Sequence, residues 1–221
     1  MMTLKLTRQE WPVLAVASLY LIPAFYYSWN RENNEFILYA AVLVVMGGLI
    51  LFLHRQVHLQ TAALWGLCLW GLAHMSGGLL PIPDSWPVNA DEPHVLYNWW
   101  IWRPYLKYDQ LVHACGFGLT TWICWQSLER VLLNRGARLT PTFGVLVLCT
   151  AAGMGFGALN EVLEFLATRL MPETNVGGYE NTGWDLVFNL IGSVLASVLI
   201  ALSSSFADRW SQDRISLTTR P

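Results

Sequence analysis

Six long apolar segments dominate this sequence. They cover residues 11–29, 36–53, 61–80, 109–128, 143–170 and 185–205. Each segment is close to or above the roughly 20 residues that an α-helix needs to cross a bilayer. None alternates with the two-residue period of a membrane β-barrel strand. The pattern predicts an all-α, polytopic bundle of about six transmembrane helices, forming one integral membrane domain over residues 1–221 with a single long connection at 81–108.

The charged residues are too few to cover a soluble protein of this length. Asp, Glu, Lys and Arg make up 13% of the 221 residues, whereas soluble domains carry roughly 25%. An apolar content of 54% excludes a disordered chain, and no cluster of basic residues is available for nucleic acid. We therefore expect the lipid bilayer to be the main partner and expect no nucleic-acid partner; the oligomeric state stays open.

The basic residues predict the orientation. Six spans place both chain ends on one side of the membrane, and nine of the 13 Lys and Arg residues fall on that side. The positive-inside rule therefore predicts cytoplasmic N and C termini and an outer position for the loop 81–108. These nine are Lys5, Arg8, Arg55, Arg130, Arg135, Arg138, Arg209, Arg214 and Arg220.

The long loop is rich in aromatic side chains. Residues 97–105 read YNWWIWRPY, and amphipathic rings prefer the headgroup region of a bilayer. We expect this segment to lie in the outer interface and to serve as an anchor. A lid, or a contact surface for a lipid headgroup, is the alternative.

Ionisable side chains within membrane spans are costly and usually mark functional sites. In this sequence they gather at one depth, in the outer parts of four predicted spans. Spacings of three or four residues place the members of each span on one helix face. The set comprises His74, Asp109, His113, Glu161, Glu164 and Asp185, with Asn160 and Asn189 beside them.

Glycines indicate that these polar faces point into the bundle. Gly153 and Gly157 continue the face of Glu161 and Glu164, and Gly192 lies seven residues after Asp185. Small residues at such spacing let helix backbones approach closely in lipid. We expect the carboxylate-bearing face of each span to be packed inside.

Structural roles are possible for single members of this set. Asp109 and Asp185 stand at predicted helix starts, where Asp caps free N–H groups. Asn189 could join two helices by hydrogen bonding, and His74 could be a satisfied core histidine. Glu161 and Glu164 are harder to explain structurally. Two carboxylates one turn apart repel unless one is protonated or a cation lies between them.

The first functional interpretation is a membrane-embedded enzyme that acts on a lipid or polyprenyl-linked substrate. A divalent ion such as Zn²⁺, Mn²⁺ or Fe²⁺ suits imidazole and carboxylate ligands, with a spare Glu as general base. Without a metal, a Glu and His113 would act as acid and base. The candidate catalytic residues are Glu161, Glu164, His113, Asp109 and Asp185. The candidate metal ligands are His74, His113, Glu164 and Asp185, and the candidate substrate contacts are Asn160, Asn189 and Trp184.

Two interpretations without catalysis remain. In a transport or binding protein, the same Glu and His side chains would form a proton relay or cation site. Against this, the sequence has no repeated half such as many transporters show. A purely structural membrane protein would explain the helices but not the pair of glutamates.

Three short motifs carry a family resemblance. Residues 108–116 read YDQLVHACG, residues 160–165 read NEVLEF, and residues 181–192 read NTGWDLVFNLIG. Together they resemble the YjdF-like family of uncharacterised bacterial inner-membrane proteins over roughly residues 72–196. They are more distantly similar to the VanZ-like family, which is associated with resistance to a glycopeptide antibiotic. The resemblance implies a multi-pass protein of the bacterial inner membrane and implies no particular reaction.

Overall fold

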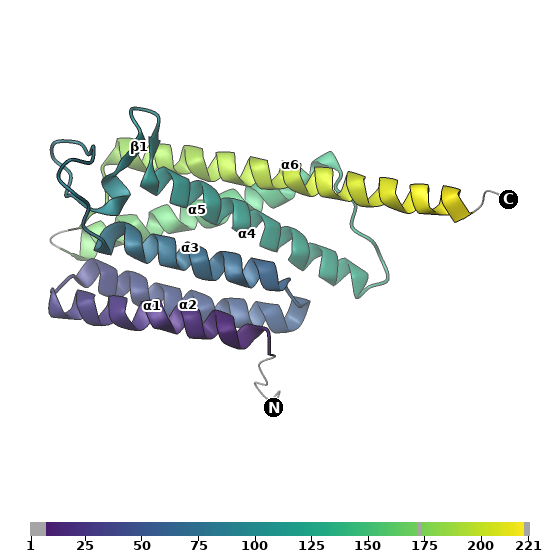
Figure 1. The fold of residues 1–221 in the computed structure, drawn as a ribbon, viewed down its shortest axis with the longest axis horizontal. Helices are drawn as coiled ribbons and strands as arrows, with labels where there is room; N and C mark the ends of the chain where they lie inside the picture. Colours follow the sequence, from purple (N-terminus) through teal and green to yellow (C-terminus); the bar gives the residue numbers. More distant parts are fainter. Residues whose placement is uncertain (1–7, 172–173, 219–221) are drawn as a thin grey trace.

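Six long helices build the protein. The computed structural model describes residues 8–171 and 174–218, with side chains described up to residue 204. The helices lie side by side with their axes roughly aligned (Figure 1), which confirms the predicted all-α class. They are α1 (Glu10–Asn30), α2 (Asn34–Val57), α3 (Thr61–Leu79), α4 (Tyr108–Leu133), α5 (Phe143–Leu170) and α6 (Tyr179–Thr218).

The helices alternate in direction, so the bundle has two distinct ends (Figure 1). The connections α1–α2, α3–α4 and α5–α6 meet at one end, which we call the loop end. The start of α1 and the last part of α6 belong to the other, which we call the terminal end. There, His54 Nε2 of α2 lies 2.8 Å from Glu10 Oε1 of α1. The backbone N–H of Gln60 likewise donates to Gln126 Oε1 of α4 over 2.8 Å.

Four of the helices are long and apolar enough to cross a membrane. Among the described residues these are α1, α2, α5 and the segment Tyr179–Ser204 of α6. The other two, α3 and α4, pack against them as full-length members of the bundle, and α4 carries several ionisable residues of its own. The count of six spans and the cytoplasmic location of the termini remain predictions.

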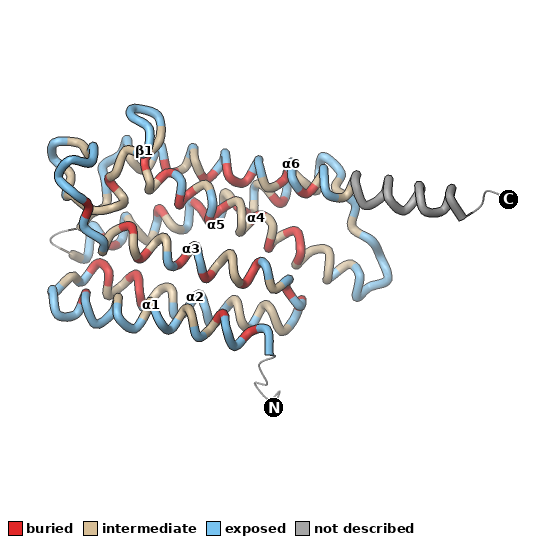
Figure 2. Tube along the Cα trace, in the orientation of Figure 1, coloured by how far each residue is buried: buried red, intermediate tan, exposed pale blue. Residues whose placement is uncertain are grey.

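Buried positions occur along the helices of the bundle (Figure 2), and they hold polar as well as apolar side chains. Among the most buried side chains are Asp185 at 1% exposure and Asn189 and Thr121 at 0%. Large apolar side chains lie on the outside instead, with Phe143 84% and Leu19 74% exposed. An apolar exterior of this extent is typical of a surface that contacts lipid.

Close backbone contact holds α4, α5 and α6 together. A Cβ atom added to Gly192 of α6 would overlap the backbone carbonyl of Ala114 in α4. A Cβ added to Gly157 of α5 would lie 2.7 Å from Asn189 Nδ2 of α6. Both contacts confirm the expectation that the glycine faces pack inside. As a result, polar side chains of the three helices can reach one another across short distances.

The apolar core of these three helices lies toward the terminal end, where Trp125, Cys149 and Ile200 form a buried cluster. A second cluster joins α2 and α3 near the loop end through Phe36, Tyr39 and Met75. The loop-end half of the α4–α5–α6 interface therefore contains polar side chains where an apolar core would otherwise lie.

The long connection is structured, which the sequence did not predict. It contains a 3₁₀ turn, η1 (Leu96–Asn98), and an antiparallel pair of short strands, β1 (Trp100–Trp102) and β2 (Leu106–Lys107). The hairpin projects to the side of the bundle (Figure 1). At its tip, Trp102 is 66% exposed and Tyr105 is 67% exposed. This exposure is compatible with an interfacial anchor, which remains a prediction.

The start of α6 differs from the prediction. The helix begins at Tyr179, six residues before the predicted start at Asp185. Asp185 is therefore an interior helical residue and cannot cap the N-terminus. Asn181 lies before the predicted span 185–205 but one turn before Asp185 in the helix, and it donates from Nδ2 to Asp185 Oδ2 over 2.7 Å. Extending the helix lets this polar pair lie on its inner face.

Candidate functional site

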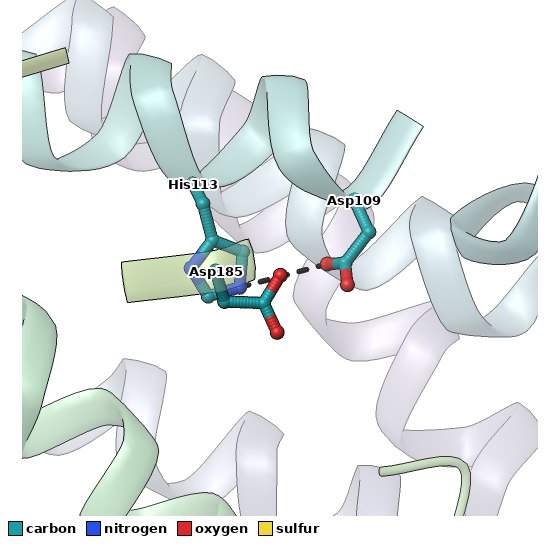
Figure 3. A group of neighbouring side chains, drawn as sticks. All are labelled: Asp109, His113 and Asp185. Carbon is teal, nitrogen blue, oxygen red and sulfur yellow. Dashed lines mark ion pairs between the residues drawn. The ribbon is translucent and has the colours of Figure 1, made fainter. Parts of the chain in front are cut away.

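His113 of α4 lies at the centre of the buried polar residues. Its Nε2 atom is 3.6 Å from Asp109 Oδ1, one turn earlier on the same helix. Its Nδ1 atom is 3.7 Å from Glu161 Oε1 of α5 and 3.0 Å from Asn189 Oδ1 of α6. Figure 3 shows His113 and Asp109 converging with Asp185 of α6. One imidazole therefore faces a different carboxylate with each of its nitrogens.

Helical spacing explains how each element supplies its side chains. Asp109 and His113 are four residues apart on α4, and Asp185 and Asn189 are four apart on α6, so each pair shares one helix face. The absence of a side chain at Gly157 leaves room for Asn189 between α5 and α6. The structure thus brings these side chains close together, and their forming a functional site stays a prediction.

Asp109 does not act as the helix cap that was considered for it. At the start of α4, the backbone N–H of Lys107 donates to the side chain of Gln110 over 2.9 Å. Lys107 itself is paired with Glu92 at 2.6 Å. The carboxylate of Asp109 faces His113 instead, which keeps this residue among the candidate site residues.

Two overlapping groups of side chains have the spacing of a metal centre. Asp109, His113 and Asp185 form one group, and His113, Glu161 and Glu164 form the other. Within each group, one ligand atom from every residue lies within 4.8 Å of the others. Imidazole together with carboxylates is a ligand set that suits Zn²⁺, Mn²⁺ or Fe²⁺.

The hydrogen bonding of these carboxylates fits a bound cation. Glu161 is 9% exposed, and neither of its carboxylate oxygens has a hydrogen-bond partner among the described residues. Asp185 is 1% exposed, and its Oδ1 atom also lacks a partner within the described part of the chain. Buried carboxylates without partners are costly, and coordination to a metal ion is one way to compensate for that cost.

His74 lies beside this cluster but in neither metal-capable group, contrary to its expected place among the ligands. Its Nδ1 atom is 2.5 Å from the hydroxyl of Tyr97. Burial raises the pKa of the Tyr97 hydroxyl well above its usual value, and the carboxylates of Asp109 and Glu164 act in the same direction. The hydroxyl therefore keeps its proton, and His74 is held by a neutral partner from the long loop.

The three candidate substrate contacts occupy different positions. Asn160 donates from Nδ2 to Glu164 Oε1 over 2.7 Å, and Asn189 contacts His113 as described above. Both amides orient side chains of the site. Trp184 is 50% exposed and does not line the cavity at the loop end, because adjacent residues of a helix point about 100° apart and Asp185 takes the inner face. The geometry does not bring Trp184 to the site.

A cavity of about 280 Å³ opens next to the cluster at the loop end. Asp109 and Glu164 belong both to its wall and to the metal-capable groups. The cavity thus connects the buried carboxylates to the region around the long loop. Its polar and aromatic lining residues include Glu35, Tyr39, His74, Asp91, Glu92, Tyr97, Asn98, Asp109, Glu164, Asn175 and Asn181.

Sequence reasoning missed several of these residues. Glu35 and Tyr39 of α2 line the cavity, and their four-residue spacing at the start of the second span was a usable signal. Asn181 stands four residues before Asp185 and was likewise visible as part of the same face. The loop residues Tyr97 and Asn175 had no such signal, because their positions depend on how two loops fold over the bundle.

Taken together, the fold and the site define a helical membrane protein with a buried histidine–carboxylate centre at one end of its bundle. The chain belongs to the family described as "Predicted membrane protein (DUF2238)", which it matches over residues 12–205. The YjdF-like resemblance is consistent with this family, whereas the more distant likeness to the VanZ-like family remains a prediction. No curated protein and no solved structure matches the chain.

Proposed function

We propose that this protein is a membrane-embedded, metal-dependent enzyme of the bacterial inner membrane whose substrate is a lipid or lipid-linked molecule. One observation carries the proposal. His113 lies between carboxylates from three helices, and the buried oxygens of Glu161 and Asp185 have no hydrogen-bond partner within the described residues. An arrangement of this kind is costly in a membrane protein unless it binds something or transfers protons.

The residues would divide the work as follows. His113 with Asp109 and Asp185, or with Glu161 and Glu164, would hold the divalent ion, which would supply Lewis acidity and lower the pKa of a bound water. The group that is not coordinated would accept or donate protons as a general base or acid. Asn189 and Asn160 would keep the imidazole and the Glu164 carboxylate in position by hydrogen bonds.

The position of the cavity supports a substrate that reaches the site from the membrane surface. The cavity lies at the loop end, beside the aromatic connection, and the bundle around it has an apolar exterior. A lipid could therefore remain in the bilayer while its polar part enters the cavity.

Metal analysis of the purified protein tests the proposal. Protein in detergent, stripped with chelator and reloaded with Zn²⁺ or Mn²⁺, should retain about one equivalent after gel filtration. His113→Ala, which removes the ligand common to both groups, should lose it. Loss in Glu161→Gln would assign the ion to the group with Glu164, and retention would assign it to the group with Asp109 and Asp185. Glu180→Gln, which alters an exposed carboxylate on the first turn of α6, is the matched control and should bind like wild type. Failure of the folded wild-type protein to retain any divalent metal would disprove the metal-dependent version.

One observation favours proton transport as a second candidate. Buried polar side chains continue from Asn189 toward the terminal end along the α4–α5–α6 interface. They include Ser193 and Thr121, both at 0% exposure, and the pair formed by Ser197 and Thr150, whose hydroxyls are 2.8 Å apart. In proteoliposomes with an internal pH dye, Glu161→Gln should reduce proton uptake if this path is used. An unchanged, background-level proton flux in wild type would exclude it.

A further inference from the structure

The cavity beside the histidine–carboxylate centre has a composition that points to a particular class of ligand. We propose that it binds the positively charged amino or ammonium group of a headgroup-sized ligand. This inference deepens the proposed function, since it concerns the substrate of the same site, but it does not require a bound metal. It rests on the charge of the cavity wall, on the aromatic rings in it and on the cavity's size.

The wall of the cavity is strongly acidic. Five carboxylate residues line it, Glu35, Asp91, Glu92, Asp109 and Glu164, and none of the described lining residues is Lys or Arg. Lys107 compensates only one of them, through its 2.6 Å contact with Glu92. A divalent ion at the centre would compensate two more charges. The cavity would still favour a cation and disfavour a free phosphate or carboxylate.

The centre behind the cavity adds to this preference. Asp185 and Glu161 are buried, and their ligand atoms lie within 4.8 Å of those of Asp109 and Glu164 respectively. Glu161 faces His113 at 3.7 Å and Asp185 accepts one hydrogen bond from Asn181, but both keep oxygens without a hydrogen-bond partner among the described residues. A cationic ligand in the cavity would be attracted by both layers of carboxylates.

Aromatic rings form another part of the wall. The ring centroid of His74 lies 5.6 Å from that of Tyr39 and 5.7 Å from that of Tyr97, and both pairs are arranged edge to face. All three residues line the cavity. Cations are attracted to the faces of Trp, Tyr and Phe rings, and proteins use such rings to recognise ammonium ligands, so Tyr39 and Tyr97 could contribute in this way. The hydrogen bond between Tyr97 and His74 keeps two of these rings in place.

Glu35 is the residue that best separates ligand recognition from the metal centre. It is 6% exposed and lies on α2, whereas the metal-capable groups are on α4, α5 and α6. Its carboxylate accepts the backbone N–H of Asn175 over 2.7 Å, which fixes it against the α5–α6 loop. A Gln at this position could still accept that hydrogen bond while removing the charge.

The cavity size limits what can enter. A volume of about 280 Å³ is at the lower limit of small-molecule sites, which are about 300–1,000 Å³. It suits a headgroup or a small free amine and excludes acyl chains. The shared chemistry is therefore an amine, and its source is either a bilayer lipid such as phosphatidylethanolamine or a soluble amine.

Two binding measurements on the purified full-length protein test the inference. In the lipid measurement, the protein is placed in nanodiscs that contain equal amounts of phosphatidylethanolamine and phosphatidylglycerol. It is then released from the nanodiscs, and native mass spectrometry identifies the lipid that stays bound. In the soluble measurement, ethanolamine or neutral ethylene glycol is titrated against thermal unfolding followed by tryptophan fluorescence. Wild type should retain phosphatidylethanolamine selectively if the ligand is a lipid. It should be stabilised by ethanolamine alone if the ligand is a free amine.

Glu35→Gln should weaken whichever binding is seen by about tenfold, as expected for the loss of one charged contact, and should leave metal content unchanged. Glu180→Gln is the control and should behave as wild type. Equal retention of the two lipids together with no effect of ethanolamine would overturn the inference. If the wild-type protein binds amines selectively but retains no metal, only the metal-dependent enzyme proposal is overturned.

Discussion

The two halves of the α4–α5–α6 interface both bury polar side chains, but they do so in opposite ways. Toward the terminal end, Thr121 donates to the backbone carbonyl of Phe117 over 2.8 Å, and the hydroxyls of Ser197 and Thr150 pair with each other. Toward the loop end, Glu161 and Asp185 are equally well buried but keep oxygens without partners in the described structure. Among the described residues of this interface, the buried carboxylates and His113 lie in the loop-end half.

The difference follows from the chemistry of the side chains. A hydroxyl on a helix can bond to the carbonyl one turn earlier, so Ser and Thr satisfy themselves at little cost. A carboxylate is an acceptor only, and a helix interior offers it no free donor. Burying it therefore requires a proton, a cation or a donor from elsewhere. The terminal-end half can be explained by packing alone, whereas the buried carboxylates of the loop-end half need a proton or a bound partner to compensate for their burial.

The largest effect should come from breaking the contact that both halves share. Gly192→Ala would place a Cβ against the carbonyl of Ala114, and overpacking of this kind costs about 2–3 kcal/mol. Reversible unfolding in mixed micelles of mild detergent and SDS would measure the loss. Gly155→Ala is the control, because its Cβ would meet nothing within 4 Å. Equal stability of the two variants would contradict the close α4–α6 packing.

The next largest effect should be a gain in stability at the loop-end half. Glu161→Leu removes a buried carboxylate without hydrogen-bond partners. The free energy of unfolding of the chelator-treated variant should therefore be about 1–2 kcal/mol higher than that of wild type. The same variant should bind no metal if the ion lies in the group with Glu164, and should still bind it if the ion lies between Asp109, His113 and Asp185. Val162→Leu, at a neighbouring exposed position, should change neither property. A destabilised Glu161→Leu protein would show that the carboxylate stabilises the fold.

The terminal-end half should respond weakly to a matched change. Thr121→Val removes a satisfied hydroxyl while keeping the shape of the side chain, and hydrogen bonds inside membrane proteins average about 0.6 kcal/mol. The loss of unfolding free energy should be of that size, with metal content unchanged. A loss several times larger, or a change in metal binding, would place Thr121 in the functional site.

The smallest effect should come from the hairpin tip. Trp102 is exposed and its ring packs only against Tyr105 among the described aromatic residues, with centroids 5.3 Å apart. Trp102→Leu should change unfolding free energy by less than about 0.5 kcal/mol and leave amine binding intact. A marked loss of ligand binding with normal membrane insertion would favour the lid over the anchor.

Much of the fold was predictable, because apolar length is a local property of the chain. The segments 61–80 and 143–170 correspond closely to α3 and α5. The prediction errors lie at positions where local sequence signals favour two different structures. Asp185 was interpreted as a helix start because Asp is a good cap, but Asn181 pairs with it inside the helix. The strands of the long loop were missed because Trp100 and Trp102 are equally typical of an interfacial segment.

The sequence by itself indicated a membrane protein and predicted that its ionisable span residues lie at one depth, namely His74, Asp109, His113, Glu161, Glu164 and Asp185. Helical spacing and the cost of charge in lipid are enough for that inference. Only the tertiary structure decided that His113 stands at the centre and that His74 pairs with Tyr97. It also placed Glu35 of α2 in the wall of the cavity. These relations join residues that are far apart in the chain, and they depend on which helices pack together.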